Sequence, residues 1–276
     1  MSTGEDSLAG EAADAAEEVS DTKALDVVAR FGFAVLALVH VLIGVIALQI
    51  AFGGDGEAEP TGALEQLASG TAGPWTMGIC AIGCLGLAIW QLSEATLRAR
   101  HLPTGQQLSK TISSGSLSII YGSVAFTFAR FSFGIGTDSS ESTQDFTAAY
   151  MGSALGNLVI IAVGGTVFGI GVYFVFKGLL RKFRPELRHF EDTRRGALIE
   201  VLGVIGHVAK GASLILVGIL FVAAVITHDA QRSTGLDGSL KALTEHPFGV
   251  PLLIAIAVGL ICYGIFALIR AKFGRM

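Results

Sequence analysis

Six apolar runs, each long enough to cross a lipid bilayer, constrain the fold of this chain more than any other feature. About 20 residues at a helical rise of 1.5 Å span the ~30 Å hydrocarbon core. The runs are Phe31–Phe52, Trp75–Ser93, Ile112–Phe133, Gly152–Phe176, Leu198–Ile226 and Phe248–Ile269. The chain is also 51% hydrophobic and only 15% charged, which is unlike a soluble domain of this size. The sequence therefore predicts an all-α membrane protein with six transmembrane helices.

Basic residues cluster on alternate connections between the runs, and this bias predicts the topology. They precede the first run, follow the second and fourth runs, and end the chain. These residues are Lys23, Arg30, Arg98, Arg100, Lys110, Lys177, Arg181, Lys182, Arg184, Arg188, Arg194, Arg195, Arg270, Lys272 and Arg275. Connections rich in Lys and Arg stay in the cytoplasm. We therefore expect a multi-pass protein of the bacterial cytoplasmic membrane, with both termini cytoplasmic and three longer polar loops outside.

The N-terminal segment has a different composition from the rest of the chain. Residues 1–22 contain seven Asp and Glu residues and no Lys or Arg. Such a segment has too little apolar surface to fold alone, and it lacks the basic and apolar regions of a signal peptide. We expect residues 1–26 to form an acidic, disordered cytoplasmic arm that docks on a basic partner surface. Glu17 and Glu18 are its candidate partner contacts.

The sequence predicts a membrane domain, residues 27–276, built from three parallel helical-hairpin repeats at about 27–100, 108–185 and 196–276. In the second helix of each repeat, a small residue is followed two positions later by an aromatic residue, and four positions beyond that by a charge. The matching triplets are Ala88, Trp90 and Glu94; Gly171, Tyr173 and Lys177; and Gly264, Phe266 and Arg270. In the first helices His40 aligns with Tyr121. The outer loops repeat too, since Gly62–Leu67 matches Gly238–Leu243, and leucines three apart predict a short interfacial helix facing the headgroups.

These repeats, with Ala29–Phe33, Leu42–Gly44, Gly235–Leu240 and His246–Gly249, carry a family resemblance. The chain resembles an actinobacterial six-helix integral membrane protein family of unknown function, built from three two-helix repeats. The resemblance extends from about Val27 to Lys272. Members of that family often carry a basic residue and a glycine midway along the first helix of a repeat. Here only Lys210-Gly211 keeps the pair, and Leu36-Ala37 replaces it in the first repeat. The resemblance brings no established active site.

Lys210 is the most unusual residue of the apolar runs, because it lies about twelve residues into the fifth of them. A charge near the middle of the membrane costs several kcal/mol unless it is paired or hydrated. One interpretation is an anion, lipid-headgroup or proton site within the bundle, with His207, His40 and Tyr121 as the other candidate polar residues. The other is a structural lysine paired with carbonyls or a polar neighbour, or a helix that enters the membrane later.

A haem held between His40 and His207 is a further hypothesis, which the repeat register disfavours. His40 aligns with Leu214, so His207 should lie seven residues nearer the cytoplasm, a depth difference of roughly 10 Å. Hydrogen-bonded histidines between helices are expected instead. The chain also shows no phosphate-binding or nucleophile motif in a strand–turn–helix context. We therefore expect no catalytic residue, cofactor or metal site.

Two classes of function remain for such a protein. The first is a non-catalytic accessory or scaffold subunit of a larger membrane complex, by analogy an actinobacterial respiratory supercomplex of the cytochrome bcc–aa3 type. Its partners would be other membrane subunits and lipids, with Arg181, Lys182 and Arg184 as candidate contacts, and no nucleic acid. The second is a transporter or binding protein for a small molecule or lipid, using Lys210. A water-filled surrounding of Lys210 would favour transport, and a dry pairing would favour a scaffold.

Overall fold

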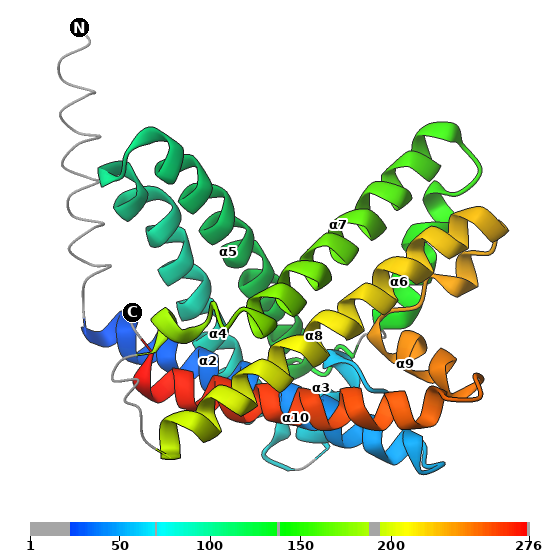
Figure 1. The fold of residues 1–276 in the computed structure, drawn as a ribbon, viewed down its shortest axis with the longest axis horizontal. Coiled ribbons are helices and arrows are strands. Elements are labelled where there is room, and N and C mark those ends of the chain that lie inside the picture. The colour runs from blue at the N-terminus through cyan, green and yellow to red at the C-terminus, as the bar shows by residue number, and fades with distance from the viewer. Residues whose placement is uncertain (1–22, 70, 137–138, 188–193, 275–276) are drawn as a thin grey trace, which may run out of the picture. The chain divides into compact units, whose positions relative to one another are not determined.

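The computed structural model describes residues 23–69, 71–136, 139–187 and 194–274, and these residues are almost entirely helical (Figure 1). Six helices in the described ranges are long and apolar enough to cross a membrane. They are α2 (Lys23–Ala51), α4 (Gly73–Ser93), α5 (Thr104–Ser132), α7 (Ala154–Leu179), α8 (Arg194–Thr227) and α10 (Gly249–Phe273). The six-helix, all-α prediction is confirmed. Most of the predicted acidic arm lies outside the described residues, and α2 already begins at Lys23.

Several helices begin well before the apolar runs that predict them. Helix α2 starts eight residues before Phe31, and α5 starts eight residues before Ile112. Outside the hydrocarbon core a helix still satisfies its own backbone hydrogen bonds, while polar side chains reach water. Hydropathy therefore identifies only the part of each helix that lies in the hydrocarbon core of the membrane, and the helix continues beyond that part.

The chain forms two compact units, and the boundary between them falls within α2, between Val35 and Leu36. In the first unit α4 packs against the first part of α2 and against α5. A Cβ on Gly32 would lie 3.0 Å from the Cβ of Leu87, and the Ser118 hydroxyl of α5 donates a hydrogen bond of 2.8 Å to the Ala88 carbonyl. These close approaches depend on the small residues at the helix contacts.

In the second unit, a seam of glycines joins α7 to α8. Gly164 faces Gly218, and Gly171 faces Gly211. A Cβ on Gly171 would lie only 2.7 Å from the Gly211 carbonyl oxygen. The contacts recur every seven residues, which is close to two helical turns, so they lie on one side of each helix. Small residues at such spacing let membrane helices approach backbone to backbone.

A second seam in this unit joins α10 to the second part of α2. Cβ atoms on Gly264 and Gly44 would each lie 2.7 Å from a backbone carbonyl oxygen, that of Ala37 and that of Ala257 respectively. Residues Ala37, Ser118 and Gly211 occupy equivalent positions in the three repeats. They contact Gly264, Ala88 and Gly171, which are equivalent positions too, so the same interface occurs three times. In it, the second helix of one repeat packs on the first helix of the next repeat. The second helix of the third repeat packs on the first helix of the first repeat.

Three shorter helices lie in the loops that join the two long helices of each repeat. They are α3 (Pro60–Ala68), α6 (Ser139–Tyr150) and α9 (Leu236–Thr244). The predicted short helices in the first and third loops are confirmed. Their expected contact with headgroups is wrong for Leu64 and Leu240, which are buried in the protein because the apolar face of each short helix packs inward.

Polar contacts link the loop helices of different repeats. The Asp237 carboxylate accepts a 2.8 Å hydrogen bond from the Ala58 backbone N–H and pairs with Lys241 at 2.7 Å. Glu59 is also buried, and it accepts hydrogen bonds from Thr61 at 2.8 Å and from Ser140 at 3.3 Å. The loops of all three repeats thereby converge in the second unit.

Candidate intramembrane site

Lys210 lies at the centre of α8, 16 residues from Arg194 and 17 residues from Thr227. Its Nζ donates a hydrogen bond of 3.2 Å to the Tyr263 hydroxyl of α10. The same nitrogen lies 4.3 Å from the centre of the Tyr263 ring and 4.8 Å from the centre of the Phe174 ring of α7. Two aromatic rings from neighbouring helices, one of which carries the bonded hydroxyl, thus lie against the ammonium group.

These contacts are strong enough to keep a cation in the bundle. A lysine at the middle of a membrane helix costs about 2.5–3.5 kcal/mol by insertion scales. A desolvated cation–π contact returns up to about 2 kcal/mol, and an interhelical hydrogen bond in a membrane returns about 0.6 kcal/mol. Two ring faces and one hydrogen bond therefore offset most of the cost without a carboxylate.

Within the part of the chain that the structure describes, the charge of Lys210 has no carboxylate partner. Among the described residues no Asp or Glu forms an ion pair with it, whereas Lys110, Lys241, Arg181 and others do have carboxylate partners. An ammonium group has three N–H donors, and within the described ranges Tyr263 is its one hydrogen-bond acceptor. The side chain is half-buried.

Two histidines lie beside the same tyrosine. The His40 ring of α2 is 4.8 Å from the Tyr263 ring, and the His207 ring is 5.3 Å from it, measured between centroids. Nδ1 of His40 is 2.7 Å from the Leu36 carbonyl, and Nδ1 of His207 is 2.6 Å from the Gly203 carbonyl. Since a carbonyl oxygen only accepts, each Nδ1 must carry the proton, which leaves Nε2 of a neutral ring as an acceptor.

His207 also fills an aromatic core position. It is 1% exposed, stacks on Phe183 with ring centres 5.0 Å apart, and meets Phe266 edge-on at 5.2 Å. In the first repeat the equivalent residues are Phe33 and Trp90, which also meet edge-on. The third repeat thus keeps the ring contact and replaces the phenylalanine with an imidazole.

The structure brings together three of the four predicted polar residues, Lys210, His207 and His40. Tyr121 instead belongs to the first unit, where its ring lies edge-on to Phe33 at 6.2 Å. The sequence reasoning missed Tyr263 and Phe174. The one available signal was a hydroxyl-bearing residue in the otherwise apolar last run, directly before the aligned Gly264.

The predicted lipid or partner contacts on the basic loop lie in different surroundings. Arg181 and Arg184 both pair with Glu200 at the start of α8, Arg181 at 2.7 Å. These two arginines therefore fasten the end of α7 to α8, while Lys182 is exposed. Glu17 and Glu18 lie outside the described residues.

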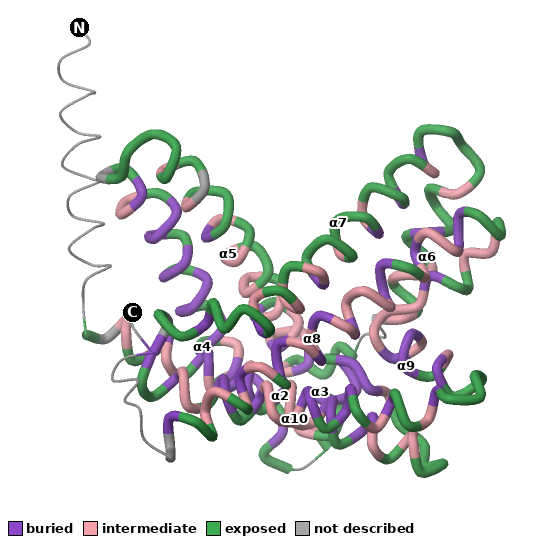
Figure 2. Tube along the Cα trace, in the orientation of Figure 1, coloured by how far each residue is buried: buried purple, intermediate pink, exposed green. Residues whose placement is uncertain are grey.

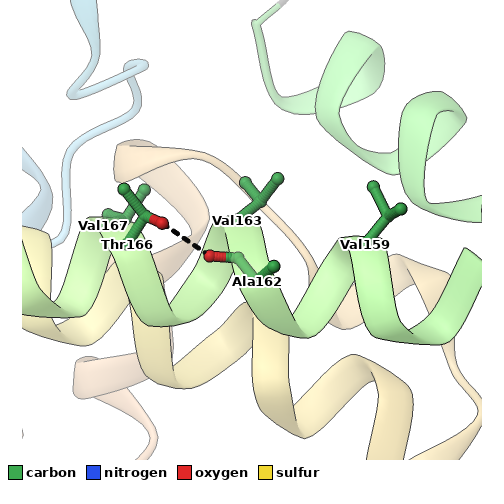
Figure 3. A pocket seen from close by; sticks show the side chains of 5 residues that line it. All are labelled: Val159, Ala162, Val163, Thr166 and Val167. Carbon is green, nitrogen blue, oxygen red and sulfur yellow. Dashed lines mark hydrogen bonds between the residues drawn. The ribbon is translucent and has the colours of Figure 1, made fainter.

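Helix α7 carries an apolar groove of about 350 Å³, lined by Val159, Ala162, Val163, Thr166 and Val167 (Figure 3). The Thr166 hydroxyl donates to the Ala162 carbonyl of its own helix at 2.7 Å. The groove therefore offers a ligand no unused polar side chain. Figure 2 shows that much of α7 is exposed along its length, and 17% of its most apolar stretch is buried.

Comparison with known proteins agrees with the repeat architecture. The family described as Domain of Unknown Function (DUF1206) matches three stretches, residues 31–98, 114–181 and 205–274. The chain belongs to the DUF1206 family. Each match coincides with one predicted two-helix repeat. "Uncharacterized protein YxxB" of Bacillus subtilis (strain 168) is 26% identical to this DUF1206 protein over 249 residues, 90% of each chain. No solved structure matches the chain.

Proposed function

We propose that this DUF1206 protein binds the acidic head of an amphiphile inside its membrane domain, with Lys210 as the counter-charge. One observation carries the proposal: a lysine at the centre of a membrane helix has aromatic and phenolic contacts but no carboxylate partner among the described residues. In a low-dielectric surrounding such a cation attracts an anion strongly.

The groups around Lys210 suit an oxygen-rich head. Its remaining N–H donors and the Tyr263 O–H can donate to oxygen atoms, and hydrogen bonds between charged groups are about twice as strong as neutral ones. Nε2 of His40 can accept a hydrogen bond from a hydroxyl of the ligand. The arrangement holds an anion in place, and the expectation that the protein is not an enzyme stays a prediction.

Equilibrium binding in phosphatidylcholine nanodiscs tests the proposal. The probes are palmitate, hexadecyl phosphate and the neutral hexadecanol, and the variants are Lys210→Met and, as a matched control, the exposed Lys182→Met. At least one anion should bind the wild type and Lys182→Met. Binding to Lys210→Met should be about tenfold weaker or more, because a charge-assisted hydrogen bond is lost. Equal binding of all three probes, or no effect of Lys210→Met, would contradict the proposal. The two anions separate a carboxylate head from a phosphate head.

An accessory-subunit role is a second candidate, supported by a different surface. Gly165 and Gly169 of α7 are four residues apart, exposed, and have open space where a Cβ would be. Glycines at this spacing are typical of helix–helix contacts in membranes. A pull-down from native membranes in mild detergent, analysed on a native gel by mass spectrometry, tests this role. Co-migration of a stoichiometric membrane subunit, weakened by Gly165→Ile, supports it. Migration of the protein alone contradicts it. The choice of a respiratory complex as the partner rests on analogy alone.

We further propose the cytoplasmic membrane as the location, with both termini in the cytoplasm. Six spans return the chain to the side where it began, and the basic connections favour the cytoplasm as that side. After the native cysteines have been replaced, a single cysteine at position 182 should react with an impermeant thiol reagent only in opened cells. A cysteine at position 241 should react in intact cells. The reverse labelling pattern would show the opposite topology, with both termini outside the cytoplasm.

A further inference from the structure

We infer that the ligand is a single-chain carboxylate whose acyl chain lies along α7, in the groove between Val167 and Val159. This inference rests on the proposed function, since it places the acidic head at Lys210. It adds the chemical class of the ligand and the path of its tail.

The groove and the charged site lie on the same flank of α7. Val163, Val167 and Phe174 recur at spacings of four and seven residues, which places them on one stripe of a helix. Val167 and Phe174 are two turns apart, a rise of about 10 Å, and the groove runs about 12 Å further to Val159. Because the Lys210 ammonium lies over the Phe174 ring, a head bound there can direct its tail along this stripe.

The lining of the groove suits a hydrocarbon chain. Four of its five residues are valine or alanine, and the Thr166 hydroxyl is already bonded to its own helix. All five lining residues belong to α7, so the groove follows one helix and suits a single chain laid along it.

The donor set at the head suits a carboxylate. One ammonium group and one phenol supply a single positive charge and two kinds of donor, which match the single charge and the two oxygens of a carboxylate. A phosphate carries more charge and a third terminal oxygen. Lys177 is the other described cation over the Phe174 ring, and its Nζ lies farther from the ring centre than that of Lys210, at 5.9 Å against 4.8 Å, so the donors closest to the head carry one positive charge.

The position of the tail is more informative than the affinity. Lipid tails are as apolar as the groove, so the groove adds packing contacts but no hydrophobic gain over the bilayer. We therefore choose photo-crosslinking with two sixteen-carbon carboxylates in nanodiscs, one with a diazirine at mid-chain and one with a diazirine near the tail end. The mid-chain probe should label residues around Val167 and Val163, and the tail-end probe should label residues around Val159. Excess palmitate should abolish both labels, and Lys210→Met should lower them about tenfold or more.

Four results would each contradict one part of the proposal: the groove, the head group or the proposed function. Labels that depend on Lys210 but lie away from α7 would contradict the groove and leave the proposed function standing. Labels that are equally strong in Lys210→Met would contradict the proposed function itself. Displacement by hexadecyl phosphate that is stronger than displacement by palmitate would contradict the carboxylate head. Val163→Trp, checked for an unchanged gel-filtration profile, should remove the α7 labels by filling the groove. Its failure to do so would also contradict the groove.

Discussion

Lys210 is held by the faces of Phe174 and Tyr263 and by the Tyr263 hydroxyl, three contacts of a kind that can stabilise a cation without neutralising it. A carboxylate partner would have closed the site, because two opposite charges at contact distance leave little attraction for a third. Ring faces offset the cost of the membrane and leave the positive charge available. The same residue is therefore tolerated by the fold and able to bind an anion.

Lys210→Met should leave the protein at least as stable as the wild type while binding is lost. The variant removes a charge that costs about 2.5–3.5 kcal/mol at the membrane centre, and it keeps an apolar side chain of similar length against both rings. We expect the free energy of unfolding to be unchanged or to rise by up to about 2 kcal/mol, since buried charges often cost more than they return. Thermal unfolding in detergent measures the change. A marked loss of stability would show that Lys210 is a structural residue.

Tyr263→Phe should separate the two contributions of the tyrosine. The ring face over Lys210 remains and the hydroxyl is lost, so ligand affinity should fall by about tenfold, as expected for one hydrogen bond to a charged group. Stability should change by less than about 1 kcal/mol. Tyr173→Phe is the matched control, because Tyr173 is exposed on α7 and should have no effect in the same titration. Equal effects of the two substitutions would argue against the assigned role of Tyr263.

At the scale of helices, glycine seams decide which segments meet. The sequence shows Gly171 and Gly264 at equivalent positions, so the repeat and its small residues could be predicted. The helix pairs could not, because each seam joins helices of different repeats, Gly171 to Gly211 and Gly264 to Ala37. Hydropathy describes one helix at a time and carries no information on its neighbour.

Gly171→Ala should destabilise the protein, and Gly169→Ala should not. A methyl group on Gly171 would lie 2.7 Å from a carbonyl oxygen of α8, whereas Gly169 has open space around it. Overpacking of this kind costs about 1–3 kcal/mol, while an alanine in an unconstrained helix gains up to about 1 kcal/mol over glycine. Thermal unfolding of the two variants side by side measures the difference. Similar melting temperatures would contradict the seam.

At the scale of the whole chain, three similar repeats carry one polar site. The positions equivalent to Lys210 are Leu36 and Leu117, and those equivalent to Tyr263 are Leu87 and Ile170. The six spans and three repeats could be predicted because they depend on hydropathy and spacing along the chain. The site could be predicted only as far as Lys210 and its histidines. Its other contacts come from helices distant in sequence, which a single sequence does not connect.

Asp237 should matter to the assembly of the loops that contain α3 and α9, because it joins the loop of the third repeat to that of the first. Asp237→Ala removes the acceptor for the buried Ala58 N–H and the partner of Lys241. Leaving a buried donor unsatisfied costs about 1–3 kcal/mol. Asp55→Ala, at an exposed loop position, is the matched control and should be neutral. Thermal unfolding and the protease sensitivity of the loops measure the effect of each substitution. Equal effects of Asp237→Ala and Asp55→Ala would contradict the contact between the two loops.

Native mass spectrometry of the protein released from its own membranes, with no ligand added, is the sharpest test of an anion site at Lys210. We expect the wild type and Lys182→Met to carry a bound acidic amphiphile, and Lys210→Met, equally folded, to carry none. The same adducts on Lys210→Met and on the wild type would contradict an anion site at Lys210.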